Sequence, residues 1–230
     1  MSKIDVLQAL NYLIAMIFAL TVHEYFHAWT ALKLGDDTAT RQGRLTLNPI
    51  AHLDPIGTLL IPMIGMLSGV PFFGWAKPVP ISPMKFTRRF RMKTGVLLTS
   101  AAGPLSNLAF AVVIAVLLGI VVQVVGKEEF SLLFQGPEPG VLKALFFLSL
   151  ATLQINVGLF FFNLIPIPPL DGSGILAGFL PDRYQHVLDS LSQYSFLLFI
   201  ALLWFGGSLI GGPIRYVSRF LLAMVGFTSG

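Results

Sequence analysis

The sequence contains no cysteine, and only 11 % of its 230 residues are charged. The lack of cysteine excludes disulfides, thiolate metal sites and thiol nucleophiles. Soluble domains carry a charge on about a quarter of their residues, so the scarcity of charge excludes an ordinary soluble globule. What is present is apolar: 55 % of the residues are hydrophobic, and the mean hydropathy is +0.78. The composition therefore predicts a membrane protein, and the net charge of +4 gives no indication of nucleic-acid binding.

Stretches without any charged residue predict how the chain is organised. The five longest are 6–22, 55–76, 94–126, 144–170 and 190–214. Because a spanning helix needs about 20 mainly apolar residues, we expect four spans, the first of which continues through His23 to about Lys33. The 55–76 stretch has three prolines and four glycines, which bend or break helices. We expect it to be re-entrant, with a full crossing as the alternative.

Charged residues between the apolar stretches predict the orientation. A run of basic residues without an acid follows 55–76, which favours a cytoplasmic loop; its members are Lys77, Lys85, Arg88, Arg89, Arg91 and Lys93. A mostly acidic loop follows 94–126 and is expected outside; its members are Lys127, Glu128, Glu129 and Glu138. We expect one integral-membrane domain over 1–230, with a core at about 7–175 and C-terminal helices at about 190–228.

One carboxylate lies inside the first apolar stretch. Glu24 belongs to the run His-Glu-Tyr-Phe-His at 23–27, and a charge in a membrane helix is costly enough to indicate function. Histidines four residues apart lie on one face of a helix, so both His23 and His27 can reach one metal ion. The spacing places Glu24 beside that pair, where it can act on a water molecule. The alternative is a group of polar residues that is satisfied within a helix bundle.

Two histidines do not complete a catalytic zinc site, which normally has three protein ligands. Asp171 is the best candidate for the third ligand, because three prolines before it fix an extended segment and Gly172 after it allows a sharp turn at the acid. Alone, an aspartate before a glycine is more often a turn former. The other candidates are His52, His186 and the remaining acidic residues. His52 could instead occupy the open zinc position, although its loop reads more simply as a turn around Asn48 and Asp54.

Three motifs together resemble the site-2 protease family of intramembrane zinc metalloproteases. They are the run at 23–27, Ala-Gly-Pro-Leu-Ser-Asn at 102–107, and Asn-Leu-Ile-Pro-Ile-Pro-Pro-Leu-Asp-Gly at 163–172. The resemblance implies an all-α polytopic membrane protein with a core of three transmembrane helices plus peripheral helices. It further implies that residues 74–80 form a short membrane-associated β-hairpin that offers a strand edge to an unwound substrate. We expect a minimal member, without a PDZ or CBS domain.

The same resemblance implies roles for individual residues. His23, His27 and Asp171 would hold one Zn²⁺ per chain, and Glu24 would be the catalytic acid and base. Substrate contacts are expected from Asn163, Asn107, Pro78 and Val79. The expected function is hydrolysis of peptide bonds within or near transmembrane segments of membrane proteins, at a prokaryotic cell membrane. The partners are then transmembrane substrates and the lipid bilayer. A catalytically inactive scaffold that binds transmembrane helices is the first alternative, and an ion or metal transporter is the second.

Overall fold

The computed structural model describes residues 3–68, 74–126 and 140–226, and this part of the chain is all-helical. The long helices are α1 (Lys3–Lys33), α4 (Met92–Val125), α6 (Val141–Asn163) and α9 (Ser195–Met224). The shorter ones are α2 (Thr38–Arg41), α3 (Ile61–Ser68), α7 (Asp171–Phe179) and α8 (Gln185–Gln193). Three 3₁₀ turns (Pro49–Ala51, Pro83–Lys85 and Asp182–Tyr184) and a π-helical stretch (Pro55–Leu60) complete them.

Three helices in the described ranges are long and apolar enough to cross a membrane. They are Gln8–Lys33 within α1, α4 and α6, and these correspond to the first three expected spans. The fourth expected span corresponds to α9, which bends by 57° between Leu202 and Trp204 and counts as a span only if its two halves are taken together. Three of the four expected spans are therefore confirmed as helices that are long and apolar enough to cross a membrane.

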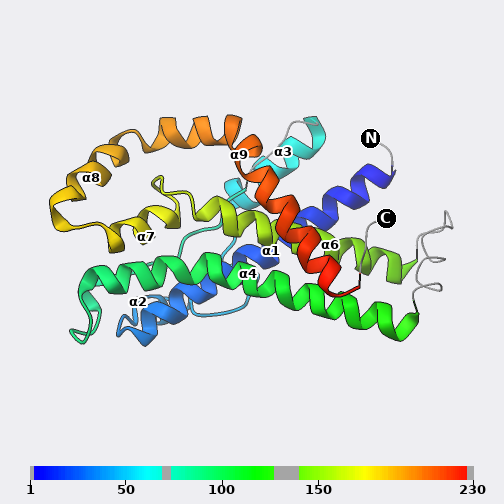
Figure 1. The fold of residues 1–230 in the computed structure, drawn as a ribbon, viewed down its shortest axis with the longest axis horizontal. Helices are drawn as coiled ribbons and strands as arrows, with labels where there is room; N and C mark the ends of the chain where they lie inside the picture. Colours follow the sequence, from blue (N-terminus) through cyan, green and yellow to red (C-terminus); the bar gives the residue numbers. More distant parts are fainter. Residues whose placement is uncertain (1–2, 69–73, 127–139, 227–230) are drawn as a thin grey trace.

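The helices α1, α4 and α6 form the centre of the bundle, with α9 across it (Figure 1). Helices α1 and α6 run in the same direction and α4 runs against both. Small side chains allow close approach between membrane helices. Ala111 and Ala115 of α4 accordingly pack against Leu153 and Val157 of α6, and Leu221 of α9 closes this cluster.

The segment after α1 enters and leaves the bundle at one place. Its helical part, Pro55–Leu60 followed by α3, has 14 residues, 6 and 8 in turn, which is too short to cross a hydrocarbon core about 30 Å thick. Beyond it the chain returns, since the N–H of Trp75 bonds the carbonyl of Gly57 at 3.3 Å. The Thr58 hydroxyl donates to the carbonyl of Trp75 at 2.7 Å. This return supports the expected re-entrant path.

The β-hairpin expected at 74–80 is wrong, because no strand is present among the described residues. The segment is irregular, and its polar backbone groups bond loops and side chains instead of a neighbouring strand. Pro78 and Pro80 have no N–H and cannot donate to a strand ladder. The N–H of Lys77 donates to the carbonyl of His52 at 2.9 Å.

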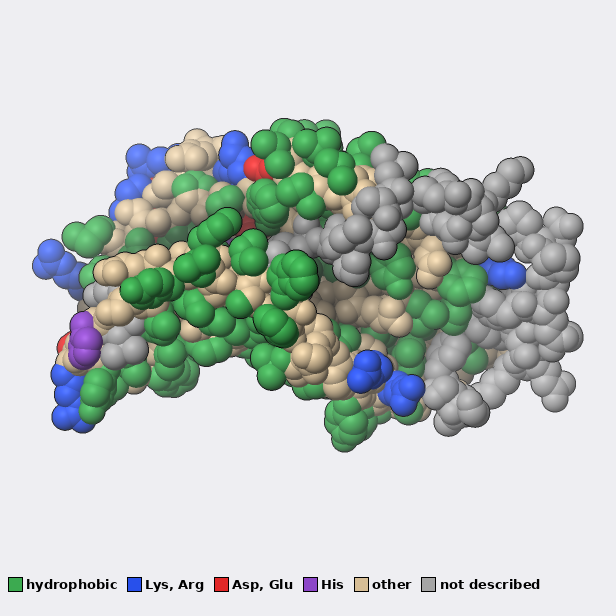
Figure 2. Space-filling view, turned by 90° about the horizontal axis from the view of Figure 1, so that it is seen from above, with side chains coloured by type: hydrophobic (Ala, Val, Ile, Leu, Met, Phe, Trp, Pro, Cys, Tyr) green, Lys and Arg blue, Asp and Glu red, His purple; other side chains and the backbone are tan. Residues whose placement is uncertain are grey.

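The surface of the molecule has apolar flanks and one basic end. Figure 2 shows lysine and arginine side chains gathered toward the end of the molecule where α2 and the start of α4 lie. Hydrophobic side chains cover much of the flank seen in the same view. Lys85 lies 3.4 Å from Asp37, which joins the loop before α4 to the loop after α1. The acidic loop expected after α4 lies outside the described residues, so the predicted orientation stays a prediction.

Candidate metal centre

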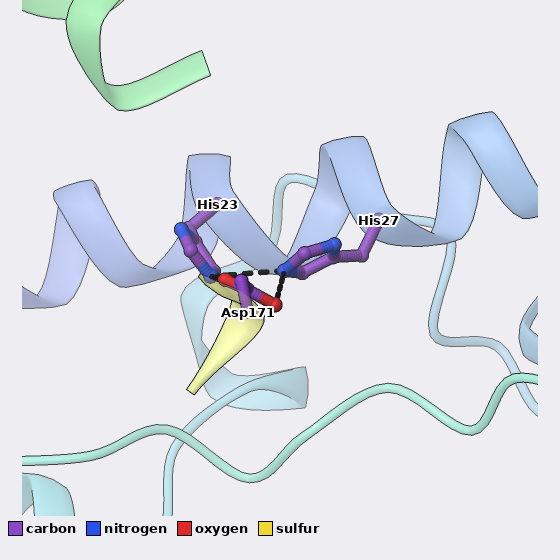
Figure 3. A group of neighbouring side chains, drawn as sticks. All are labelled: His23, His27 and Asp171. Carbon is purple, nitrogen blue, oxygen red and sulfur yellow. Dashed lines mark hydrogen bonds and ion pairs between the residues drawn. The ribbon is translucent and has the colours of Figure 1, made fainter. Parts of the chain in front are cut away.

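Three side chains from two distant parts of the chain converge on one point (Figure 3). His23 and His27 lie one turn apart on α1, and their Nε2 atoms are 2.9 Å apart. Asp171, the first residue of α7, places Oδ2 3.1 Å from Nε2 of His23 and Oδ1 3.3 Å from Nε2 of His27. The structure thus brings together the three residues that the sequence suggested as metal ligands.

The opposite edge of each imidazole ring is held by a hydrogen bond. Nδ1 of His27 lies 2.7 Å from the carbonyl oxygen of Thr99, which can only accept, so Nδ1 carries the hydrogen. Nδ1 of His23 lies 2.7 Å from Oδ1 of Asn107. In a neutral ring whose Nδ1 is protonated, Nε2 presents a lone pair. Both Nε2 lone pairs therefore face the convergence point.

The convergence point carries an excess of acceptors. Two Nε2 lone pairs and a carboxylate face one another, and Oδ2 of Asp171 is buried and accepts no hydrogen bond within the described chain. Such acceptors repel each other unless a cation lies between them. Two imidazoles and one carboxylate are a known donor set for catalytic zinc. The residues present therefore fit a divalent metal ion such as Zn²⁺.

Two glycines give the ligands the room they need. A Cβ at Gly103 of α4 would lie 2.3 Å from Nε2 of His27 and 2.6 Å from Cε1 of His23, so only glycine lets the imidazoles pack against this helix. A Cβ at Gly172 would lie 2.4 Å from the carbonyl oxygens of Leu164 and Ile165. The glycine after Asp171 therefore permits close packing at the start of α7, not the sharp turn expected from sequence.

A cavity of about 1070 Å³ opens beside the three ligands, and most of its lining is apolar. All three ligands and Glu24 line it, with walls from α1, α3, α4, α6, α9 and residues 74–81. Glu24 is only 8 % exposed. Its Oε2 accepts a hydrogen bond of 2.7 Å from the N–H of Val79. A buried carboxylate is thus held beside the candidate metal centre.

Residues that the sequence analysis missed hold the segment that contacts Glu24. The buried Arg44 donates from Nη2 to the carbonyls of Lys77 at 2.6 Å and Pro78 at 3.3 Å. Asp36 accepts the N–H of Ser82 at 2.5 Å. Position alone could not have singled these residues out, because both follow the first span in a polar loop.

Asp36 is 1 % exposed and belongs to this support, away from the metal ligands. Although burial raises the pKa of its carboxyl, hydrogen bonds from Ser82 and Thr38 and the nearby Lys85 charge outweigh this and lower the pKa below its ordinary value. The pKa of the exposed Asp37 is also lowered, chiefly by the hydrogen bond from Arg41. Charge at this loop therefore favours the folded state near neutral pH.

The expected substrate-contacting residues divide into two groups. Asn163, Pro78 and Val79 line the cavity, so their expected role is compatible with the structure and stays a prediction. Asn107 does not line it and is fully buried; its amide bonds His23, the carbonyl of Ala19 and another asparagine. A substrate contact from Asn107 is thus not supported, because every polar atom of its side chain already has a protein partner.

The two remaining histidines stand apart from the metal ligands. His52 neither joins the cluster nor lines the cavity. It is 2 % exposed, and its Nε2 lies 2.8 Å from the carbonyl of Thr46. Its loop is formed as the sequence indicated, with Asn48 and Asp54 capping the helical turns that follow. His186 lies in α8, exposed, and bonds the carbonyl of Arg183.

The chain is similar to proteins that are named as zinc metalloproteases, which is consistent with a zinc-binding donor set. The protein named "Putative zinc metalloprotease YwhC" of Bacillus subtilis is 41 % identical over 189 residues, which cover 82 % of this chain and 78 % of the relative. The Rip2 proteins of Mycolicibacterium smegmatis and Mycobacterium tuberculosis carry the same description and are 33 % and 32 % identical. Those alignments cover 81 % and 85 % of this chain but 64 % and 66 % of the relatives. No family model and no solved structure matches the chain.

Proposed function

Because the chain belongs to the zinc metalloprotease family of YwhC and Rip2, we propose that it cleaves peptide bonds within or near transmembrane segments of membrane proteins, as a site-2 protease does. One observation carries this proposal. A donor set for zinc and a buried glutamate line a single cavity inside a bundle of helices long enough to span a membrane. Cleavage of a membrane-embedded substrate needs an active site inside such a bundle, whereas cleavage of a soluble substrate does not.

His23, His27 and Asp171 would hold the zinc ion. When bound, zinc supplies Lewis acidity that lowers the pKa of water to about 7 and polarises a peptide carbonyl. The two Nδ1 hydrogen bonds keep both Nε2 atoms directed at the ion. The apolar lining of the cavity limits bulk water around the reacting groups, which strengthens their electrostatic interactions.

Glu24 is the proposed general base and acid. It takes a proton from the attacking water and passes it to the leaving nitrogen of the cleaved peptide bond. The Val79 N–H occupies Oε2 and keeps the carboxylate turned toward the cavity. Asn163 is the proposed donor to the substrate carbonyl, since it lines the same cavity.

The 74–82 segment is the proposed substrate platform. A helical substrate hides its scissile carbonyl in the helix hydrogen-bond ladder, so it must unwind before it can react. Unwound backbone in a membrane needs new hydrogen-bond partners. Pro78 and Val79 lie along the cavity in a segment with an irregular backbone, which can offer such partners.

The experiment compares the native protein with Glu24→Gln in liposomes that contain a library of single-span membrane proteins. Mass spectrometry then identifies newly formed peptide termini. We expect about one zinc per chain in both proteins, and new termini inside or beside the spans only with the native protein. The variant should lose about 10² to 10⁴-fold in rate, since only the base is removed.

Three results would contradict the proposal in different ways. Equal cleavage by both proteins would remove Glu24 from the reaction. Cleavage confined to soluble regions far from the spans would leave a zinc protease but refute its intramembrane character. Zinc binding and substrate binding without any cleavage would favour the scaffold instead.

A further inference from the structure

A chain of buried amide groups links the three central helices behind His23. The Asn156 Nδ2 of α6 donates to the carbonyl of Thr152 at 2.8 Å. The Asn107 Nδ2 of α4 donates to Oδ1 of Asn156 at 2.8 Å and to the carbonyl of Ala19 at 3.1 Å. Oδ1 of Asn107 lies 2.7 Å from Nδ1 of His23. Both asparagine side chains are fully buried.

The orientation of both amides follows from their backbone partners. A carbonyl oxygen can only accept, so the atom of Asn156 that faces Thr152 must be nitrogen, and its oxygen must face Asn107. Asn107 then directs one N–H at that oxygen and the other at Ala19. Its remaining atom, the oxygen that faces His23, can only accept. Nδ1 of His23 must therefore carry the hydrogen, and in the neutral ring Nε2 then presents its lone pair.

We infer that Asn156 is a positioning residue, which acts through Asn107 to fix the tautomer of His23 and hence its readiness to bind zinc. The inference rests on the proposed function, because it assigns a task to residues behind the zinc ligands. Groups that hold the second nitrogen of a ligating histidine typically change metal affinity by roughly 10–100-fold when they are removed. Asn156 touches neither the cavity nor any ligand, so neither sequence position nor contact with the site reveals it.

His27 provides an internal comparison. Its Nδ1 bonds the backbone carbonyl of Thr99, an acceptor that no side-chain substitution can remove. The tautomer of His27 is therefore set by the helix backbone, whereas that of His23 depends on two side chains. Removing Asn156 should disturb His23 and leave His27 unchanged.

The alternative is that the two asparagines only join the helices. Interhelical amide bonds do stabilise membrane bundles. In that case the loss of Asn156 lowers thermal stability but changes neither the His23 tautomer nor zinc affinity.

The experiment uses the full chain in detergent with Asn156→Leu and Asn107→Leu. Two matched controls remove a buried hydroxyl from the same helices and leave in place both asparagines and the Thr152 carbonyl that Asn156 contacts. Thr152→Val loses only its bond to the carbonyl of Leu148, and Ser106→Ala loses only its bond to that of Gly103. Competition with a chelator gives the affinity for Zn²⁺, and ¹⁵N NMR of the histidine rings shows which nitrogen carries hydrogen.

We expect Asn107→Leu to weaken zinc binding by about 10–100-fold and Asn156→Leu by about tenfold. Both controls should stay within about twofold. In the Asn156 variant the His23 signals should change and those of His27 should not. Unchanged zinc affinity and unchanged His23 signals in Asn156→Leu would overturn the inference.

A measurement on the native protein covers the case in which the leucine variants do not fold. In the native chain after a chelator has removed zinc, the neutral His23 ring must show hydrogen on Nδ1, because bound zinc would by itself exclude hydrogen from Nε2. Hydrogen on Nε2 would overturn the inference without any variant. If the native chain binds no zinc at all, the proposed function itself fails, which separates the two outcomes.

Discussion

Two aspartates in this protein, Asp36 and Asp171, lie in opposite electrostatic environments. Asp36 is surrounded by donors, since it accepts from the N–H of Ser82 and from both the N–H and the hydroxyl of Thr38. Asp171 faces the Nε2 atoms of His23 and His27, which are acceptors in the neutral rings, and its Oδ2 is buried without a hydrogen bond in the described chain. The first carboxylate is complete within the protein, whereas the second needs a cation from outside.

The difference shows how a residue type can serve structure at one site and chemistry at another. A satisfied buried carboxylate ties loops together, as Asp36 does for the loop after α1 and the 74–82 segment. An unsatisfied one costs stability unless it binds a ligand. Such a cost is typical of functional sites. A substitution at Asp171 should therefore weaken mainly zinc binding, whereas one at Asp36 should lower mainly stability.

The largest effect is expected at Asp171. Asp171→Asn keeps the size of the side chain but removes the charge that holds the cation. Zinc affinity should fall by more than the roughly 100-fold typical of a lost supporting group, while the fold is retained. Chelator competition and circular dichroism measure the two properties. His52→Ala is the control, and a loss of zinc from that variant in place of Asp171→Asn would show that the third ligand has been misassigned.

Asp36→Asn should show the reverse behaviour. In the variant an amide N–H₂ group takes the place of one carboxylate oxygen and faces a hydrogen-bond donor, to which it cannot bond. Thermal unfolding in detergent should therefore show that the free energy of unfolding falls by roughly 1–3 kcal/mol. Zinc affinity should stay within about threefold of the native value, because Asp36 touches none of the ligands. A large loss of zinc with unchanged stability would contradict the distinction between the two aspartates.

A substitution at Arg44 would test whether the supporting loops influence the proposed catalytic residue Glu24. Arg44→Ala releases the carbonyls of Lys77 and Pro78, so the neighbouring Val79 N–H should hold Glu24 less firmly. We expect a fall in kcat of about tenfold, the low end for a hydrogen bond from a charged group. Zinc content should be unchanged. Arg44→Lys should restore only part of the activity, because a flexible ammonium is not held in one place as the planar guanidinium is. Full activity in Arg44→Ala would remove this residue from the support of Glu24.

The smallest expected effect is the loss of stability at acidic pH that Asp36 causes. The pKa of Asp36 is lowered in the folded protein from an ordinary value of 3.8. Its contribution to stability is therefore complete above that value and is lost as the pH falls through the folded pKa. Unfolding measured between pH 7 and pH 3 should show native stability falling mainly below about pH 4. The loss should be smaller in Asp36→Asn, and identical pH profiles for the two proteins would show that Asp36 contributes nothing to it.

The spans and the metal ligands could be predicted because they depend on local rules. Apolar length predicted α1, α4 and α6, and the spacing of His23 and His27 placed both on one helix face. The hairpin could not be predicted correctly. The irregular course of 74–82 depends on Arg44, His52 and Asp36, which lie at least 22 positions earlier in the chain. Their donors and acceptors replaced the strand pairing that the sequence suggested.

The sequence by itself determined which groups this protein can use: two imidazoles one turn apart, a carboxylate between them, and helices too apolar for water. These follow from residue type and from the fixed period of a helix. Only the tertiary structure decided how those groups are held. It turned Asn107 away from the cavity and toward His23 and tied it to Asn156. It also gave Asp36 N–H and O–H donors, whereas it placed Asp171 against two imidazole nitrogens. The reason is physical, because hydrogen-bond direction depends on which groups meet across helices, and no local pattern along the chain contains that information.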